Sequence, residues 1–551
     1  MTASRTAARI FADQLVIHGA DTIFGVPGES YLDLLDAIYD TPSLRFVTCR
    51  QEGGATMMAD AHAKLTGKPG ICAVTRAPGA TNASAGIHIA EQDATPLILL
   101  VGHNARAAIG RKTFQEVDYR QMFGGMAKEI SVIEDATRIP EIVSKAFHMA
   151  TSGRPGPVVI VLPEDMLADV ATVADARPYQ AFEPYPAPEQ MNQVREALLT
   201  AHRPCVILGG SQWDKDAKKC LEDFATANAL PVVTEFIRND RFDNRHPSYG
   251  GNCGLGGNPH ARAFLKDSDL IIAIGGELGE ISTERFTSME GPAPRQRLIH
   301  ILPDADRLGI VYQPEIGIVA SPRNFCKALT GLAPVPDTRW APATAALRKT
   351  YEEQRAKVTS PGAVQMSEIM YWLEDNLPDD TIFTNGAGNF RVWLHRFHQY
   401  GDLGTQVAST SGSMGYGVPA GVASKIICPD QPVVTFCGDG DFLMTGQEFA
   451  TAMLHDAPLI VIVVNNGMYG TIRADQERHF PHRQIATRLH NPDFAALARA
   501  FGGHGETVEA TADFAPAFER ARASGKPAIV EIRIDPEAIT VDKTISQLRP
   551  A

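Results

Sequence analysis

Short apolar runs alternate with helix-forming windows along most of the chain. In the first third, the runs GICAVT and PLILLVG flank the window GATNASAGIHIAEQ, which follows a glycine-rich turn. The middle third repeats the pattern with CVILGG, LPVVTEF, DLIIAIGG and RLIHIL, and the last third with DTIFTN, PVVTFCGDG, PLIVIVVNNG and PAIVEIRID. Continuous Val- and Ile-rich strands that alternate with helices predict parallel sheets with both faces covered.

Two stretches interrupt this pattern and divide the chain. Residues 174–190 are rich in proline, and residues 333–363 carry few apolar positions, so both are interpreted as linkers. The predicted fold class is α/β, with three consecutive doubly wound parallel-sheet domains at residues 1–173, 191–332 and 364–551. The first 20 residues have helical spacing and predict a first helix rather than a signal peptide.

Composition and charge exclude several classes of protein. The net charge is −13 and the basic residues are scattered, so a nucleic-acid partner is not expected. The sequence contains no uncharged apolar run of about 18 residues, and we therefore expect no membrane-spanning helix. The 8 cysteines form no C-x-x-C pair, which is typical of reduced thiols in a cytoplasmic protein.

Two polar clusters directly follow apolar strands in the last third. Asp439 stands in Gly-Asp-Gly and Asn466 in Asn-Asn-Gly, and each cluster alone is also typical of an ordinary turn. Because parallel strands end at one edge of a sheet, we expect the two side chains to lie close together. Their oxygens suit Mg²⁺, which takes further ligands from water and phosphate. Gly438, Gly440 and the amides that open a helix within residues 445–454 would then approach a diphosphate.

These motifs resemble those of a known family. Together with FGVPGESYLDLLDAI, RQEGGATMMADAHAKLTGKPGICAVTRAPGATNA, FQEVD and STSGSMGYGVPAGVASK, they resemble the thiamine-diphosphate-dependent enzymes, in particular the acetolactate synthase-like branch. The resemblance covers nearly the whole chain and implies the domain order pyrimidine-binding, central and diphosphate-binding. It implies that Asp439, the Asn466 side chain and the Met468 carbonyl hold Mg²⁺ on the cofactor. The other cofactor-binding residues that it implies are Met414, Gly412, Gly388, Gly438, Gly440, Asp441 and Tyr469.

The resemblance also implies a catalytic glutamate. In the family, a glutamate hydrogen-bonds N1′ of the aminopyrimidine and favours the imino tautomer, which removes the C2 proton of the thiazolium. Glu52 has the matching position, and Met414 the position of the side chain that folds the two rings together. Taken alone, Glu52 is also typical of a helix start and Met414 of core packing. Family sites lie between subunits, so we expect a homodimer or homotetramer.

Four positions are informative about the substrate. Two match residues near the active site of the family, and two differ from acetolactate synthase. The resemblance places Gln115 and Lys128 near the active site, although both also suit a polar surface. Asp475 stands where acetolactate synthase has a substrate-selecting tryptophan. Glu91, near His88, stands where that enzyme has a pocket phenylalanine. Charged side chains in a pocket need polar partners, so these residues indicate a polar substrate unless they point into solvent.

The flavin motif of acetolactate synthase is also missing. Residues 275–286 replace the Arg-Phe-Asp-Asp-Arg stretch that holds FAD, so FAD is doubtful. Two interpretations of the central domain remain open. It is either a nucleotide-binding fold without a ligand, or a site for a nucleotide such as the nucleotide part of coenzyme A. It has no G-x-G-x-x-G motif with an acidic residue about 20 positions on, which argues against a nicotinamide-dependent oxidoreductase.

We therefore expect an enzyme that uses thiamine diphosphate and Mg²⁺ to act on a small-molecule 2-oxo acid or a related carbonyl compound. The expected reaction is decarboxylation, carboligation or both. A lyase of 2-hydroxy ketones or 2-hydroxyacyl-CoA thioesters is the alternative within the class. A catalytically silent homologue is a further alternative.

Overall fold

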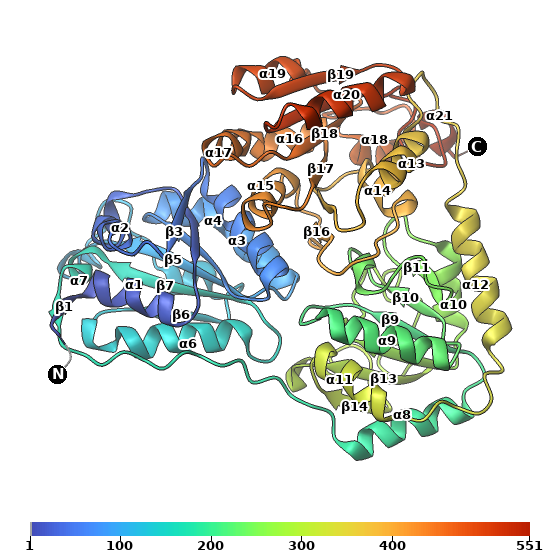
Figure 1. Ribbon diagram of the computed structural model, residues 1–551, viewed down its shortest axis with the longest axis horizontal. Helices are drawn as coiled ribbons and strands as arrows, with labels where there is room; N and C mark the ends of the chain where they lie inside the picture. Colours follow the sequence, from blue (N-terminus) through green and yellow to red (C-terminus); the bar gives the residue numbers. More distant parts are fainter. Residues whose placement is uncertain (1–2, 551) are drawn as a thin grey trace.

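The computed structural model describes residues 3–550 and contains three parallel sheets of six strands each (Figure 1). Every ladder within these three sheets is parallel. The predicted fold class is therefore confirmed. Each sheet lies inside one of the three predicted ranges, and the domain limits themselves stay predictions.

The N-terminal domain, drawn in blue and cyan in Figure 1, has the strand order β3-β2-β4-β5-β7-β6. Its strands are β2 (Thr22–Gly25), β3 (Arg45–Thr48), β4 (Gly70–Val74), β5 (Leu97–His103), β6 (Glu129–Val132) and β7 (Pro157–Pro163), and β1 (Arg5–Thr6) pairs with β8 (Val170–Ala171). Its helices are α1 (Ala7–Ile17), α2 (Leu32–Tyr39), α3 (Glu52–Thr66), α4 (Ala77–Gln92), α5 (Tyr119–Phe123), α6 (Ile139–Thr151) and α7 (Glu164–Leu167). The predicted first helix is present as α1.

The central domain has the strand order β11-β10-β9-β12-β13-β14. Its strands are β9 (Pro204–Leu208), β10 (Val232–Thr234), β11 (Tyr249–Asn252), β12 (Leu270–Ile274), β13 (Arg297–Leu302) and β14 (Ile316–Val319). Its helices are α8 (Pro188–Thr200), α9 (Lys215–Ala227), α10 (Pro259–Asp267), α11 (Pro322–Ala328) and α12 (Ala341–Gln354).

The C-terminal domain, orange to red in Figure 1, has the strand order β16-β15-β17-β18-β20-β19. Its strands are β15 (Ile382–Asn385), β16 (Gln406–Ala408), β17 (Val433–Gly438), β18 (Ile460–Asn465), β19 (His504–Val508) and β20 (Ala528–Arg533). Its helices are α13 (Met366–Asn376), α14 (Arg391–Phe397), α15 (Gly417–Ile427), α16 (Asp439–Thr445), α17 (Phe449–Leu454), α18 (Gly470–His479), α19 (Phe494–Ala500), α20 (Thr511–Ala523) and α21 (Ile545–Leu548).

The second predicted linker is wrong in its middle part. Helix α12 occupies residues 341–354, and Trp340, Leu347 and Tyr351 are buried against the central domain. The buried positions 347 and 351 are one helical turn apart, whereas the residues between them (Arg348, Lys349 and Thr350) are charged or polar and dilute the apolar pattern. The first linker contains no helix or strand between residues 172 and 187.

The cysteines and the lengths of the helices can be compared with the expectations from composition. All 8 cysteines are free, and six of them are buried. Within residues 3–550, no helix is long and apolar enough to cross a membrane.

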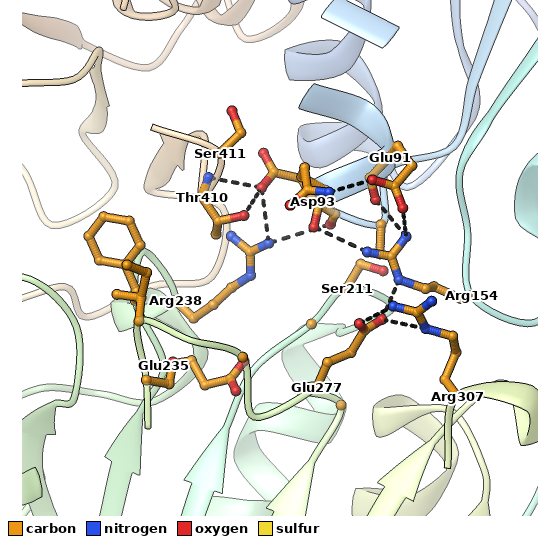
Figure 2. A pocket seen from close by; sticks show the side chains of 18 of the residues that line it. Glu91, Asp93, Arg154, Ser211, Glu235, Arg238, Glu277, Arg307, Thr410 and Ser411 are labelled. Atoms are coloured by element: carbon orange, nitrogen blue, oxygen red, sulfur yellow. Dashed lines mark hydrogen bonds and ion pairs between the residues drawn. The ribbon is translucent and has the colours of Figure 1, made fainter. Parts of the chain in front are cut away.

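One buried carboxylate connects all three domains. Asp93, which follows α4, forms an ion pair with Lys64 of α3 and lies 3.8 Å from the guanidinium of Arg238 in the central domain. The backbone N–H of Thr410, in the C-terminal domain, donates to Asp93 Oδ1 at 2.9 Å. Figure 2 shows Arg238 and Thr410 converging on this carboxylate. A buried charge is tolerated only when it is paired, so these contacts fix the relative positions of the domains.

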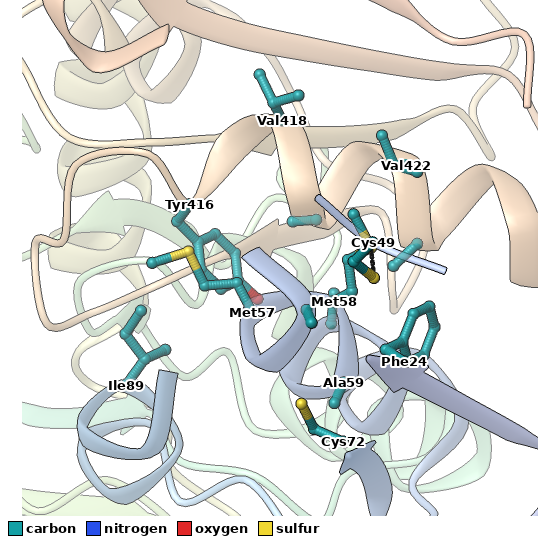
Figure 3. Packing of buried hydrophobic residues seen from close by; sticks show 14 of the residues in the cluster. Phe24, Cys49, Met57, Met58, Ala59, Cys72, Ile89, Tyr416, Val418 and Val422 are labelled. Atoms are coloured by element: carbon teal, nitrogen blue, oxygen red, sulfur yellow. Dashed lines mark hydrogen bonds between the residues drawn. The ribbon is translucent and has the colours of Figure 1, made fainter. Parts of the chain in front are cut away.

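The N- and C-terminal domains also share one hydrophobic core. Helix α15 packs on α3, and Figure 3 shows Tyr416, Val418 and Val422 lying over Met57 and Met58. All five residues belong to a single buried cluster, and each fully buried Val or Met side chain contributes about 1.5–3 kcal/mol. The start of α3 is therefore held in a fixed position against the C-terminal domain.

The packing of α3 on α4 makes the first testable prediction. A Cβ atom at Gly86 of α4 would lie 2.4 Å from Cβ of Thr56 in α3, which forces the two helices apart. Gly86→Ala should therefore lower the free energy of unfolding by about 1–3 kcal/mol, measured as a lower denaturation midpoint. Gly125→Ala is the control, because a Cβ atom there would meet nothing beyond its own chain neighbours within 4 Å. Equal midpoints for the two variants would contradict this account of the helix packing.

Candidate active site

The first candidate site lies where β17 and β18 end. The two strands are parallel neighbours, with Gly438 opposite Val464, so Asp439 and Asn466 follow them at the same edge of the sheet. Both residues line a cavity of about 280 Å³. The same cavity is lined by the other predicted cofactor and metal residues, Gly388, Gly412, Met414, Gly438, Gly440, Asp441, Met468 and Tyr469. The structure thus brings together every predicted residue of the C-terminal domain.

Asp439 is a buried carboxylate with one amide partner. Only 2% of the residue is exposed, and its Oδ2 accepts a hydrogen bond from Asn491 Nδ2 at 2.7 Å. The same Asn491 nitrogen donates to Asn465 Oδ1 at 3.0 Å. Burial raises the pKa of Asp439, so a bound cation would stabilise its ionised form. Sequence analysis missed Asn491, because an asparagine before a proline is typical of a turn.

The remaining oxygen donors at this edge suit a hard cation. Asn466 Oδ1 accepts from the Met468 N–H at 3.2 Å, which closes a turn through Gly467. Within residues 3–550, no group of three His, Cys, Asp or Glu side chains is placed to hold a metal ion. One carboxylate, one amide oxygen and a backbone carbonyl fit Mg²⁺ when a diphosphate and water supply the other ligands. These residues therefore fit a metal–diphosphate group and not a metal held by protein alone.

The backbone of the two glycines that flank Asp439 lies close to two aromatic rings. A Cβ atom at Gly438 would lie 2.9 Å from Phe390 Cδ1, and one at Gly440 would lie 2.5 Å from Tyr469 Cε1. No larger residue fits at either position without displacing a ring. The glycines therefore bring the start of α16 directly to the cavity.

Helix α16 begins earlier than the sequence analysis predicted. It starts at Asp439, directly after β17, and the expected helix within residues 445–454 begins after a break as α17. The amides closest to the strand end are thus those of Asp439, Gly440 and Asp441. Alternating glycine and aspartate is typical of a turn, and this composition hid the helix.

Asp441 holds two loops of the cavity together. Its Oδ1 accepts the N–H groups of Ala387 and Gly415, each at 2.9 Å, and burial raises the pKa of Asp441 to about 6. One of these loops carries Gly388 and the other carries Met414. Asp441 therefore fixes the backbone of two loops that line the cavity, one at Ala387 and the other at Gly415.

Glu52 is not a lining residue of this cavity, whose walls come from residues 387–539. It is the first residue of α3, and its Oε2 accepts from Asn82 Nδ2 of α4 at 2.9 Å. The C-terminal domain contacts the same helix start through Glu448. That buried carboxylate accepts the Gln51 N–H at 2.9 Å and the Arg50 N–H at 3.2 Å. Sequence analysis missed Asn82 and Glu448, since only the folded chain brings them to Glu52.

Gln115 and Lys128 lie at opposite edges of the N-terminal sheet. Gln115 follows β5 at the carboxyl edge, where its carbonyl accepts the Ala77 N–H, and its φ is 61°. Lys128 precedes β6 at the amino edge and donates to the carbonyls of Ser152 and Arg154 at 2.6 and 2.8 Å. Burial lowers the pKa of Lys128 to about 8. The two residues are not neighbours within one chain, and their roles stay predictions.

A second cavity, of about 590 Å³, lies between the domains. It adjoins the carboxyl edge of the central sheet, where Glu277 binds both Arg154 and Arg307 (Figure 2). The Glu235 carboxylate fills the space beside Gly209 and Gly276, and burial raises its pKa to about 7. The charge of Glu277 is balanced by its two arginine partners, so FAD stays doubtful on the sequence pattern alone.

The two positions that differ from acetolactate synthase, Glu91 and Asp475, have different environments. Glu91 lines the interdomain cavity and lies 3.7 Å from Arg154. His88 is exposed, and Asp475 is exposed and pairs with Arg478 at 2.7 Å. Within one chain, only Glu91 thus faces a cavity.

Comparison with known proteins agrees with this geometry. Family models of the thiamine pyrophosphate enzymes match residues 5–122 (N-terminal TPP binding domain), 191–329 (central domain) and 386–532 (C-terminal TPP binding domain). An acetolactate synthase large subunit of Parasynechococcus marenigrum is 31% identical, covering 91% of this chain and 83% of its own. The acetolactate synthase isozyme 2 large subunit of Escherichia coli is 29% identical, covering 95% of each chain. A probable acetolactate synthase large subunit of Methanocaldococcus jannaschii is 30% identical, covering 95% of this chain and 90% of its own.

The chain therefore belongs to the thiamine-diphosphate-dependent enzymes, in their acetolactate synthase-like group. It is an enzyme of the decarboxylase or carboligase type. The predicted resemblance is confirmed.

The contact between Glu448 and the start of α3 makes the second prediction. Glu448→Gln replaces one acceptor oxygen by an NH2 group that cannot accept a hydrogen bond. A single oxygen then remains for the Arg50 and Gln51 N–H groups and the Thr451 hydroxyl, which should cost about 1–3 kcal/mol. We expect faster hydrogen exchange at residues 50–54, measured by mass spectrometry. Glu519→Gln, which removes a partly exposed partner of Arg522, is the control and should leave that exchange unchanged. Unchanged exchange in both variants would show that Glu448 does not fix the helix start.

Proposed function

We propose that the protein uses thiamine diphosphate and Mg²⁺ to decarboxylate a 2-oxo acid, to join the resulting acyl unit to an acceptor, or both. The observation that carries this proposal is the cavity at the ends of β17 and β18, which combines Asp439, Asn466 and the close-packed glycines. Thiamine diphosphate, when bound, would supply the electron sink that lets a bond beside a carbonyl carbon break or form.

The chain's own residues have three roles in this proposal. Asp439, the Asn466 side chain and the Met468 carbonyl hold Mg²⁺ and thereby orient the diphosphate. Met414 lies in the cavity wall beside Gly412 and keeps the cofactor rings folded. Glu52 holds a proton at N1′ of the aminopyrimidine, the position from which a general acid–base residue acts.

The proposed site is completed by a second copy of the chain. Its support is that Glu52 lies outside the cavity lined by Asp439. Two apolar side chains of α16, Leu443 and Met444, are 47% and 46% exposed, and they lie two and three residues after Asp441, which lines the cavity. A second subunit would cover these side chains while bringing its own Glu52 to the cofactor. A homodimer is then the smallest active unit, and a homotetramer is two such dimers.

A lyase of 2-hydroxy ketones or 2-hydroxyacyl-CoA thioesters is the second candidate. The large interdomain cavity favours it, because it offers about 590 Å³ beside the central domain for an extended substrate. FAD stays doubtful, and neither candidate reaction requires it, because neither is a redox reaction.

A substrate panel tests the proposal and separates the two candidates. Protein loaded with thiamine diphosphate and Mg²⁺ is incubated with pyruvate, glyoxylate, benzoylformate and 2-hydroxyacyl-CoA thioesters, and the products are analysed. Turnover of a 2-oxo acid supports the first candidate. Turnover of thioesters alone supports the second, and the absence of any 2-oxo acid turnover contradicts the first.

Glu52→Gln tests the proposed proton-holding residue. The variant should still bind thiamine diphosphate and Mg²⁺, because Glu52 is not at the metal end of the site. Exchange of the cofactor C2 proton should slow by on the order of 10²-fold, measured by NMR after quenching. Glu29→Gln, which changes an exposed carboxylate of the same domain, should exchange normally. Normal exchange in Glu52→Gln would remove this residue from the mechanism.

Asp439→Ala tests the proposed metal site. Loss of the only carboxylate among the three proposed Mg²⁺ ligands should weaken cofactor binding by at least about 10-fold, measured by calorimetric titration at fixed Mg²⁺. Asp475→Ala is the control, because that carboxylate is exposed and pairs only with Arg478. If cofactor affinity is the same in the wild type and Asp439→Ala, the Mg²⁺ assignment is wrong.

A further inference from the structure

Arg391 is a buried cation without a partner. It is the first residue of α14, only 8% of it is exposed, and its Nη1 is buried without a hydrogen-bond acceptor. Its guanidinium carbon lies 4.6 Å from the ring centroid of Phe236. Within residues 3–550, its side chain has no ion pair. An uncompensated buried charge strongly disfavours the folded state, so the residue needs an explanation beyond packing.

Arg391 differs in this respect from the other arginines of the interdomain cavity. Arg154 and Arg307 both bind Glu277, and Arg238 lies beside Asp93. Each of these side chains has a carboxylate partner within the chain. Arg391 is therefore the one arginine of this cavity, among the described residues, that is free to bind an anion from outside.

Arg391 lies at the boundary between the interdomain cavity and the proposed cofactor cavity. Arg391 and Gly412 line both the interdomain cavity and the cavity that contains Asp439 and Asn466. Asp441 is the carboxylate whose charge acts on Arg391. Its Oδ1 accepts two backbone N–H groups, its Oδ2 has no hydrogen-bond partner, and the two side chains form no ion pair within the described residues. Arg391 thus stands where the two cavities meet, and the proposed metal ligands line only one of them.

We propose that Arg391 binds a carboxylate that the substrate retains through the reaction. This inference rests on the proposed function, because it concerns the substrate of the same site. A guanidinium offers two parallel N–H donors that match a carboxylate, and it remains charged when desolvated. The retained carboxylate has two possible sources, the acceptor in a carboligation or the distal end of a dicarboxylic 2-oxo acid.

The carboxylate that leaves as carbon dioxide is a poorer ligand for Arg391. Its charge is lost from the carboxyl group as the transition state forms, so an ion pair to it stabilises the ground state more than the transition state. A carboxylate that is retained keeps the ion pair throughout and orients the reacting carbonyl. Arg391 is in this proposal a specificity-determining residue.

The test compares substrates with and without a retained carboxylate. Arg391→Met should raise KM on the order of 100-fold for glyoxylate as acceptor or for 2-oxoglutarate as donor. It should leave KM unchanged for acetaldehyde as acceptor with pyruvate as donor. A higher KM for glyoxylate alone would assign Arg391 to the acceptor carboxylate, and a higher KM for 2-oxoglutarate alone would assign it to the distal carboxylate of the donor. Equal losses with all substrates, or no loss with any, would overturn the proposal.

Three controls separate binding from folding and from cofactor retention. Arg307→Met removes a paired arginine of the same cavity and should leave all KM values unchanged; a similar loss there would implicate the overall charge of the cavity. Arg391→Met should not lower the melting temperature, because it removes an unpaired buried charge. Weaker binding of thiamine diphosphate in Arg391→Met would assign Arg391 to the cofactor diphosphate and overturn the proposal.

A binding measurement keeps this test independent of turnover. Calorimetric titration of the holoenzyme with succinate and with its neutral diamide should show binding of the dianion only, and Arg391→Met should abolish it. If the wild type turns over no 2-oxo acid, the proposed function fails, and this titration still decides the role of Arg391. Absence of succinate binding to the wild type, or undiminished binding to the variant, would overturn the proposal.

Discussion

The packing of α3 against α15 is the contact on which the arrangement of the candidate site depends. It joins the N- and C-terminal domains into one core, with Tyr416 and Val418 lying over Met57 and Met58. Without this core, the start of α3 would have no fixed position in its own chain, and a second subunit could not bring its Glu52 to the proposed metal residues. Glu448 adds a polar contact at the same place, since a buried carboxylate accepts hydrogen bonds only from donors in precise positions.

Charged residues at the two cavities differ in whether they have a charged partner. Buried Asp93 and partly exposed Glu277 are matched by lysine or arginine side chains of the chain itself, and they hold domains and loops together. Asp439 and Arg391 lack a charged partner in contact, and both line the cofactor cavity. Since desolvated charge is unfavourable unless compensated, ligands of opposite charge are the expected partners of Asp439 and Arg391. Glu448 is also a buried carboxylate without an ion pair, but the backbone N–H groups of Arg50 and Gln51 satisfy it, and its role is structural.

The sequence allowed prediction of the features that depend on local pattern. Long apolar strands such as β17 and β18 were predicted, because strands buried on both faces carry continuous Val and Ile. The equally apolar β7 was not named among the predicted strands. The edge strands β16 and β19 mix polar and apolar residues and were missed. Helix α12 was assigned to a linker because charge dilutes its apolar positions. Asp439 and Asn466 were brought together correctly because parallel strands end at one edge, whereas Asn491, Glu448 and Arg391 depend on contacts between distant segments.

The two ends of the cofactor cavity differ in charge, and this difference bears on how ligands are oriented. β15 and β17 are neighbours in the sheet; Asp439 follows β17, and Arg391 lies on the segment that follows β15. The carboxylate at one position attracts a cation and, through it, a diphosphate, while the guanidinium at the other attracts an anion directly. The proposed Mg²⁺-bound cofactor and a carboxylate-bearing substrate would therefore be drawn to different parts of one wall. Before a cation binds, a free carboxylate near Asp439 would meet repulsion, whereas Arg391 would attract it.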